Sequence, residues 1–386
     1  MEFIDLKTQQ ERIRDTLNSN IQKVLHHGNY IMGPEVKQLE AKLAAYTGTK
    51  HAISCASGTD ALLMALMAYG VKPGDAIFTT PFTFIATAEV ITLLGATPVF
   101  VDIDTKTFNI DPKKLALAIQ AVKTNNPSVY PLPTTPHTSP LIAKGVIPVD
   151  LFGLLADYKT IDAIAQEQGL FVIEDAAQSF GAQYKNKMAC SFGHVACTSF
   201  FPAKPLGCYG DGGMCFTDDD NLAAALESIR VHGKGGHKYD NIRIGINGRL
   251  DTLQAAILLA KFDIFPEEVQ LRQTAAQRYN SLLSPDNSLL KPHIPKECTS
   301  AWAQYSIMAR DEDHRTNLLK KFQGNKIPTA IYYLTPLHRQ TAFAFLGYQA
   351  GSFPVSEDTS KRILSLPMHP YLTQQEQAKI AEVIKG

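Results

Sequence analysis

One lysine stands in surroundings that would make its amine reactive. Lys204 lies in the run 198–207, which continues into a glycine-rich stretch at 208–213. Its apolar neighbours are Phe200, Phe201, Pro202, Pro205 and Leu206. A lysine is generally a solvated surface residue, but apolar surroundings disfavour the charged amine. A neutral amine can condense with an aldehyde, so Lys204 is a candidate Schiff-base lysine.

An acidic residue follows a predicted strand. Asp175 comes soon after the apolar run 170–173, and in open α/β sheets ligands bind at the carboxyl ends of strands. A carboxylate there can keep a pyridine nitrogen protonated, which makes the ring an electron sink. Ala176 and Ala177 are small enough for a ring to lie against them. By itself, an acidic residue at a strand end is more often a turn or cap residue.

A phosphate seat is indicated at the start of a predicted helix. The sequence Ser57-Gly58-Thr59 lies between a predicted strand, 51–56, and a predicted helix, 60–69. Unpaired amides at a helix start, with hydroxyls beside them and a glycine that allows close approach, suit a phosphate dianion. Taken alone, the cluster favours a simpler interpretation, in which Ser57 or Thr59 caps the helix.

Two further runs, one aromatic and one rich in glycine, are candidate binding segments. The segment 80–84 follows a predicted strand, and a ring there could cover one face of a bound aromatic group while Ala177 supports the other. On spacing alone, ordinary core packing explains it equally well. The glycines at 207–213 precede a predicted strand instead of opening a helix, which argues against a dinucleotide-binding loop.

The elements that would position these residues alternate along the chain. Short apolar runs rich in Val, Ile and Phe alternate with helical patterns, which predicts an α/β fold. The predicted strands are 51–56, 76–79, 97–101, 146–151, 170–174, 196–200 and 213–217. The predicted helices between them are 60–69, 84–94 and 159–168.

Two domains are expected, because 386 residues exceed the length at which a single core usually stops growing. A long helix from Leu250, broken near Pro266, joins them. We predict a large domain over 1–255 and a smaller C-terminal α+β domain over 256–386. The predicted strands of the smaller domain are 301–309 and 329–333, and its predicted helices are 314–323 and 374–385.

One segment looks inserted into the large domain. Residues 125–140 hold five prolines together with several Ser and Thr. We predict an exposed, irregular loop there instead of a part of the sheet.

Composition narrows the class of partner. The 37 basic residues balance the 37 acidic ones, which gives no reason to expect nucleic acid or an anionic membrane. The acidic start lacks the apolar stretch of a signal peptide, and no run is long enough to span a bilayer, so a cytoplasmic protein is expected. Cys190, His194 and Cys197 match no common zinc spacing, and no metal is expected.

Together the clusters resemble the DegT family of nucleotide-sugar aminotransferases over nearly the whole chain. The shared runs are 57–62, 174–179, 199–207 and 210–213. The resemblance implies a large domain of pyridoxal phosphate (PLP) fold type I, similar to aspartate aminotransferase. It also implies that Lys204 carries the cofactor, Asp175 pairs with the pyridinium nitrogen, Gln178 contacts the ring hydroxyl and Phe84 stacks on the ring. Gly58, Thr59 and Ser199 would hold the phosphate.

The resemblance also implies a homodimer with shared active sites. The segment 247–251 matches the one that, in this family, completes the site of the neighbouring chain. Asn247 would then reach the partner's phosphate, and Arg249 would lie near the sugar. Without the resemblance, Asn247 would simply mark the start of the helix near Leu250.

The expected donor is L-glutamate, with Lys204 as the proton shuttle. The nearest subgroup aminates position three of a UDP-linked N-acetylated glucuronic acid for bacterial surface polysaccharide, and the runs 239–245 and 365–372 resemble it. Tyr333 and His338 are expected beside the sugar, although the run 332–338 departs from the subgroup's pattern. Another nucleotide-linked keto sugar is the alternative.

Four other classes of protein are possible alternatives. A dehydratase branch of the same family uses histidine where Lys204 stands, so the lysine argues against it. Cysteine desulfurases and aldolases share the broad fold, but the glycine run after Lys204 and the Asn247 segment favour the sugar branch. A non-catalytic relative would have lost Lys204, Asp175 or the phosphate cluster, and all are present.

Overall fold

A mainly parallel sheet forms the centre of the molecule. The computed structural model describes residues 1–134, 140–237, 239–283 and 289–385, and within these ranges seven strands run in the order β1-β9-β8-β5-β4-β2-β3. Neighbouring strands are parallel except β9, which is antiparallel to both β8 and β1. This confirms the predicted α/β fold with a mainly parallel sheet. The strands are β1 (His51–Cys55), β2 (Asp75–Thr79), β3 (Thr97–Phe100), β4 (Ile142–Ile147), β5 (Phe171–Asp175), β8 (Val195–Ser199) and β9 (Gly213–Thr217).

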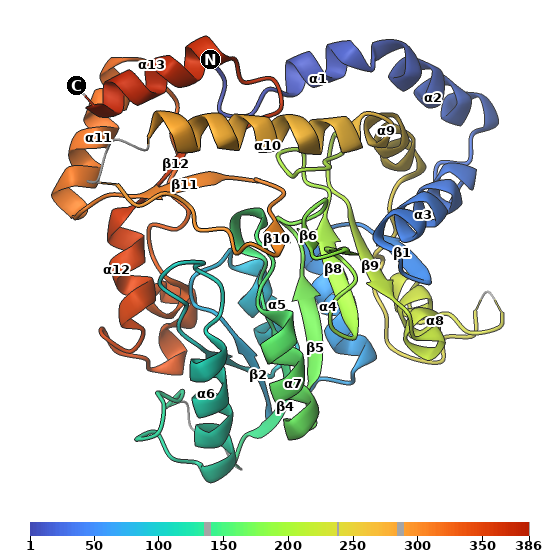
Figure 1. The fold of residues 1–386 in the computed structure, drawn as a ribbon. Helices are drawn as coiled ribbons and strands as arrows, with labels where there is room; N and C mark the ends of the chain where they lie inside the picture. Colours follow the sequence, from blue (N-terminus) through green and yellow to red (C-terminus); the bar gives the residue numbers. More distant parts are fainter. Residues whose placement is uncertain (135–139, 238, 284–288, 386) are drawn as a thin grey trace.

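Helices cover both faces of the sheet (Figure 1). Consecutive strand residues point to opposite faces: Ile77 belongs to the core cluster that includes α4 and α8, whereas Phe78 belongs to the cluster that includes α6 and α7. Both faces are therefore buried, as is usual for parallel sheets. The helices of this part are α1 (Leu6–Arg12), α2 (Arg14–His27), α3 (Pro34–Thr47), α4 (Gly58–Ala68), α5 (Ala86–Leu93), α6 (Pro112–Thr124), α7 (Tyr158–Gln168) and α8 (Asp220–Arg230).

The C-terminal part has its own small antiparallel sheet. The strands β11 (Tyr305–Met308) and β12 (Ile363–Leu366) pair with each other, and α10, α11 and α13 pack around them. The predicted break near Pro266 is confirmed, since α9 ends at Phe262 and α10 begins at Phe265. The helices here are α9 (Thr252–Phe262), α10 (Phe265–Leu282), α11 (Glu312–Gly324), α12 (Pro354–Arg362) and α13 (Gln374–Lys385).

Contacts cross the predicted domain boundary in both directions. Gln9 of α1 donates from Nε2 to Glu268 Oε2 on α10 at 2.8 Å, and Phe353 packs into the core of the large sheet. A short sheet of β10 (Cys298–Thr299), β6 (Gln183–Tyr184) and β7 (Lys187–Met188) also joins the two parts. The boundary at residue 255 stays a prediction.

Two predicted strands differ from the structure. The strand predicted over 146–151 lies over Ile142–Ile147, because Pro148 follows and has no N–H to donate to a ladder. Residues 329–333 form no strand; within them Ala330 pairs with Ser365, and β12 occupies the place beside β11.

The predicted inserted loop is only partly exposed. Residues 125–134 contain neither helix nor strand, as expected, but Tyr130 is buried at 9% exposure. Its ring packs with the core of the large sheet. Residues 135–139 of the predicted loop lie outside the described residues.

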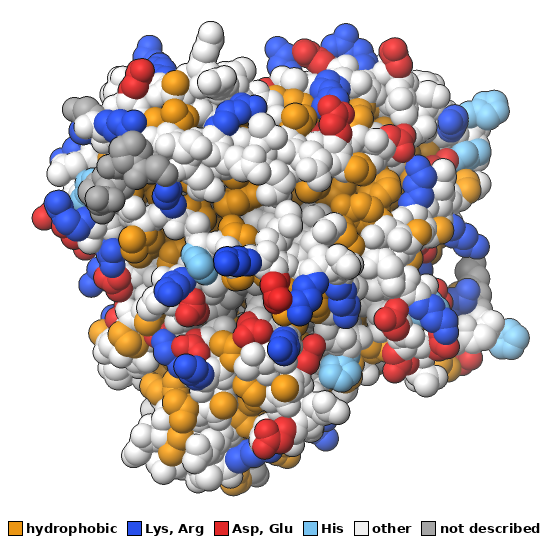
Figure 2. All heavy atoms as spheres, viewed as in Figure 1, with side chains coloured by type: hydrophobic (Ala, Val, Ile, Leu, Met, Phe, Trp, Pro, Cys, Tyr) orange, Lys and Arg blue, Asp and Glu red, His pale blue; other side chains and the backbone are white. Residues whose placement is uncertain are grey.

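The surface mixes both signs of charge. On the face shown in Figure 2, Lys and Arg side chains alternate with Asp and Glu, without a large area of one sign. Among the helices of the described residues, none is long and apolar enough to cross a membrane.

Candidate active site

The start of α4 and the end of β8 meet at the predicted phosphate seat. Ser57 Oγ accepts from Asp60 N at 3.0 Å, so Ser57 caps α4. A Cβ atom on Gly58 would lie 2.6 Å from Ser199 Cβ, which shows how closely the two segments approach. The amides of Gly58 and Thr59, in the first turn, donate to no described residue. Free amides, a hydroxyl and the helix dipole therefore share one location.

Gly58→Ala is expected to weaken phosphate binding. The added methyl group would collide with Ser199, and relieving such overpacking costs about 1–3 kcal/mol. The Kd for pyridoxal phosphate, the cofactor that the sequence resemblance implies, should rise roughly 5- to 150-fold, measured by titration of the apoprotein. Gly324→Ala is the matched control, because no atom lies within 4 Å of its Cβ position. Wild-type affinity in Gly58→Ala would contradict the phosphate seat.

A buried carboxylate ends β5. Asp175 is 4% exposed. Thr87 Oγ1 donates to its Oδ2 at 2.7 Å and Ala177 N to its Oδ1 at 3.2 Å. Burial raises the pKa of Asp175, while the bonds from Thr87 and Ala177 and the charge of Lys204 lower it. The charge of this carboxylate is thus only partly compensated, which suits a cationic ring nitrogen as its partner.

The lysine lies on the loop after β8. Lys204 is partly buried, and its backbone N–H donates to Phe201 O at 2.9 Å. Burial lowers the pKa of Lys204, and the nearby charge of Asp175 raises it. No described residue hydrogen-bonds its Nζ. The structure therefore brings together a depressed-pKa amine and a buried acid, as the sequence predicted.

Gln178 and Tyr333 form one side of the site. Gln178 Nε2 donates to the Tyr333 hydroxyl at 3.2 Å, and Gln178 Oε1 accepts from Phe152 N at 2.8 Å. The ring of Tyr333 packs edge-on against Phe82, with centroids 5.9 Å apart. Both predicted residues therefore lie together, close behind the end of β5.

Phe84 lies on the loop after β2 and is 56% exposed. An exposed aromatic ring on this loop leaves a face free for stacking. Whether it stacks on the cofactor stays a prediction.

Asn247 and Arg249 line an open cleft of about 410 Å³. Its wall also contains Ala56, Gly210 and Asp211. Arg249 Nε is buried and has no hydrogen-bond partner among the described residues, so it is available for an anionic group. The role of Asn247 and Arg249 in the site of a neighbouring subunit stays a prediction.

His338 lies away from open space. Its side chain is 0% exposed, its Nε2 lies 2.9 Å from Glu357 Oε1, and its ring packs on Phe353. This geometry favours a structural role for His338 over the expected contact with a sugar.

Besides Asp175, the structure contains a pair of buried acids that the sequence did not predict. Asp150 and Glu174 are both 0% exposed. Asp150 accepts from Ser179 Oγ at 2.7 Å and from Tyr158 OH at 2.9 Å. Burial raises the pKa of Asp150 to about 7, and burial together with the charge of Asp150 raises the pKa of Glu174. We expect one proton to be shared by the two carboxyl groups.

Because of this pair, we expect the free energy of unfolding to fall as the pH rises. In the unfolded chain both acids have a pKa near 4, so between about pH 4 and the raised value of about 7 the folded state binds more protons. The free energy of unfolding therefore falls as pH rises through this window. Asp150→Asn removes one titrating group and should make the fall of melting temperature between pH 5 and pH 8 shallower. The exposed Asp313→Asn should keep the wild-type slope; an equal slope in Asp150→Asn would refute the shared proton.

These features fit one cofactor. A buried acid for a ring nitrogen, an amine for an aldehyde and free helix amides for a phosphate are the groups that pyridoxal phosphate requires. Fold and site together define a PLP-dependent enzyme of fold type I.

Comparison with known proteins narrows the class. The DegT/DnrJ/EryC1/StrS aminotransferase family matches residues 11–385, and the chain belongs to this family. It is 49% identical over 372 residues to UDP-2-acetamido-2-deoxy-3-oxo-D-glucuronate aminotransferase of Pseudomonas aeruginosa, covering 96% of each protein.

Solved structures agree with this assignment. An aminotransferase of this family from Brucella abortus superimposes with a TM-score of 0.93 at 50% identity, over 100% of this chain and 99% of that one. NtdA of Bacillus subtilis, with bound cofactor PMP, gives a TM-score of 0.85 at 28% identity, over 100% and 83%. The chain is thus a pyridoxal phosphate-dependent sugar aminotransferase.

Proposed function

We propose that this enzyme moves an amino group from L-glutamate to C3 of a UDP-linked N-acetylated 3-keto sugar acid. The product would serve bacterial surface polysaccharide synthesis, and the enzyme would act in the cytoplasm. The observation that supports the sugar is the 49% identity to the P. aeruginosa enzyme, whose name specifies a 3-oxo-glucuronate. The proximity of Lys204 and Asp175 supports the chemistry.

Pyridoxal phosphate, when bound, supplies an aldehyde for the donor's amine and a ring that takes up the electron pair left when a carbon loses its proton. Lys204 Nζ acts as the general base that removes the proton from the donor's α-carbon. The same amine, now protonated, then gives up this proton as the general acid. Its lowered pKa favours the neutral form that this base requires.

The remaining residues bind and orient. Asp175 holds positive charge on the ring nitrogen, and Thr87 fixes the carboxylate by its hydrogen bond. Gln178 faces the ring hydroxyl, Phe84 covers the ring, and Gly58, Thr59 and Ser199 bind the phosphate. Fixing these groups before reaction removes the cost of arranging them during it.

Two subunits would complete each site. Asn247 of one subunit would bind the phosphate group in the other, and Arg249 would contact the sugar nucleotide. The unpartnered Nε of Arg249 supports an anionic ligand, such as a diphosphate or a sugar carboxylate. Tyr333 would contact the substrate, because its hydroxyl accepts from Gln178 at the site. His338 would not, because its side chain is buried and paired with Glu357.

One experiment tests the function in two stages. The PLP-loaded enzyme is mixed with L-glutamate, and the loss of the cofactor's visible absorbance is followed. Purified UDP-linked 3-keto and dTDP- or UDP-linked 4-keto sugars are then added separately, and recovery of the absorbance is measured. Recovery with the UDP-linked 3-keto sugar acid alone is expected. Recovery only with a 4-keto sugar would reject C3, and no loss with glutamate would reject the donor.

A further inference from the structure

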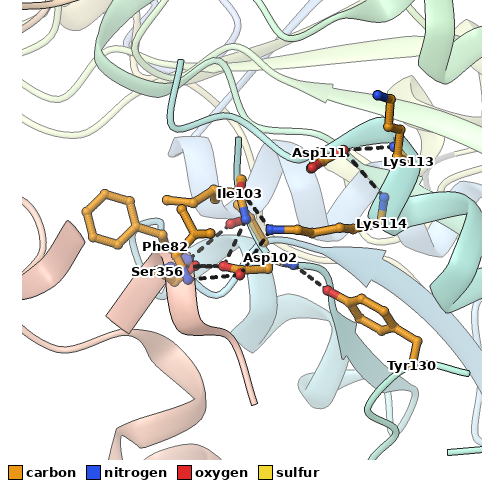
Figure 3. Close-up of polar contacts among 10 residues, drawn as sticks. Phe82, Asp102, Ile103, Asp111, Lys113, Lys114, Tyr130 and Ser356 are labelled. Carbon is orange, nitrogen blue, oxygen red and sulfur yellow. Dashed lines mark hydrogen bonds and ion pairs between the residues drawn. The ribbon is translucent and has the colours of Figure 1, made fainter. Parts of the chain in front are cut away.

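One helix of the C-terminal part is capped by a residue of the large sheet. α12 begins at Pro354, and its own N-cap residue, Phe353, makes no side-chain capping bond. The carboxylate of Asp102, which follows β3, takes that place (Figure 3). It accepts from Val355 N at 3.0 Å, Ser356 N at 2.9 Å and Ser356 Oγ at 2.6 Å. A carboxylate at this end also compensates the helix dipole.

Asp102 is itself held from the other side. It is 2% exposed, and Lys114 Nζ lies 3.2 Å from its Oδ2. Its backbone N–H donates to the Tyr130 hydroxyl at 2.8 Å. Tyr130 belongs to the proline-rich segment, in which Thr134 N also donates to Leu346 O at 2.9 Å. The segment 125–134 therefore bonds both to Asp102 and to the chain that leads into α12.

The capped end of α12 lies against the wall of the active site. Val355 packs in one cluster with Phe82 and Tyr333, and Tyr333 accepts from Gln178. The Leu337 amide donates to Pro81 O at 2.7 Å, which ties the same chain to the loop that carries Phe84. A displacement of α12 would therefore move the residues that border the cofactor's ring.

We propose that Asp102 is a positioning residue of the aminotransferase, and that residues 125–134 form a strap that fixes it. Asp102 holds α12 so that Tyr333 and the 80–84 loop keep the spacing that Gln178 and Phe84 need. It touches neither substrate nor cofactor and acts through Val355. The part of this inference that concerns the keto sugar rests on the proposed function.

The test compares Asp102→Asn, Ser356→Ala and Tyr130→Phe in the PLP-loaded enzyme. The visible circular dichroism of the bound cofactor reports its orientation and needs no sugar. Asp102→Asn should shrink or shift this band and lower kcat/KM for the keto sugar about 10-fold, less than the roughly 100-fold loss of a 1 Å misplacement. Ser356→Ala and Tyr130→Phe should change the band in the same direction by smaller amounts.

Asp219→Asn is the matched control, because Asp219 caps its own helix, α8, through Asn221 N and Leu222 N. It should lower the melting temperature without changing the band. If Asp102→Asn likewise lowers only the melting temperature, Asp102 serves stability alone and the proposal is overturned. Should Asp102→Asn fail to fold, an unchanged band in both Ser356→Ala and Tyr130→Phe would overturn it as well. If no keto sugar is aminated, the proposed function fails while the circular dichroism still decides the role of Asp102.

Discussion

Replacing Lys204 by arginine should lower the rate of amino transfer on the order of 10⁴-fold, because one amine is expected both to carry the cofactor and to move the proton. Arginine keeps the positive charge and most of the length, but it stays protonated and cannot act as a base. The loss should appear already in the reaction with L-glutamate alone, followed by the visible absorbance of the bound cofactor. Treatment with borohydride should fix a pyridoxyl label at Lys204 in the wild type, detected by peptide mass spectrometry.

Lys261 is a demanding control for this assignment. It is 1% exposed, burial lowers its pKa to about 8, and its Nζ lies 4.7 Å from the centroid of the Tyr209 ring without a hydrogen-bond partner among the described residues. Judged by burial and lowered pKa alone, Lys261 would therefore also qualify as the lysine that carries the cofactor. Lys261 has no described contact with Asp175 or the phosphate seat, so Lys261→Met should retain the labelling of Lys204. A label on Lys261, or normal turnover by Lys204→Arg, would refute the assignment.

The site residues that could be predicted from the sequence are those in short motifs at the ends of strands. Ser57 to Thr59 and Lys204 follow a strand directly or within one loop, and Asp175 ends one. Parallel strands bring their carboxyl ends to one edge. Local order along the chain was therefore enough to predict that these groups meet.

Contacts between residues far apart in the sequence could not be predicted in this way. Thr87 lies 88 residues from Asp175, and nothing around it in the sequence marks its hydroxyl as a donor to a carboxylate. His338 belongs to the run 332–338, which suggested a sugar contact, but its burial depends on Glu357 and Phe353 of a later segment. Asp102 is likewise explained only by α12, 254 residues further on.

The N-terminal helices were missed for a different reason. Pro34 at the first turn of α3 and Gly48 in the left-handed conformation at its end are ordinary start and stop signals. They precede the first predicted strand, so the alternation that revealed the sheet did not include them. The start and stop signals of α3 were therefore present in the sequence, but the alternation of strands and helices from which the fold was predicted begins after them.

Asp175→Asn should lower the rate of the reaction with L-glutamate on the order of 10²- to 10³-fold. The amide keeps the shape and can still accept the hydrogen bond of Thr87, but it brings no charge to the ring nitrogen. Removing one member of a buried ion pair costs about 3–5 kcal/mol, and the electron-sink property of the ring depends on that protonated nitrogen. Single-turnover absorbance measurements with the PLP-loaded variant would give the rate.

Thr87→Val separates the charge of Asp175 from its orientation. Thr87 lowers the pKa of Asp175 through its hydrogen bond, so valine should raise that pKa further while leaving the carboxylate in place. The rate should fall less than in Asp175→Asn, and the loss should be largest at low pH, where more of the acid is protonated. An Asp175→Asn enzyme as fast as Thr87→Val at neutral pH would show that charge at this position is not what drives the reaction.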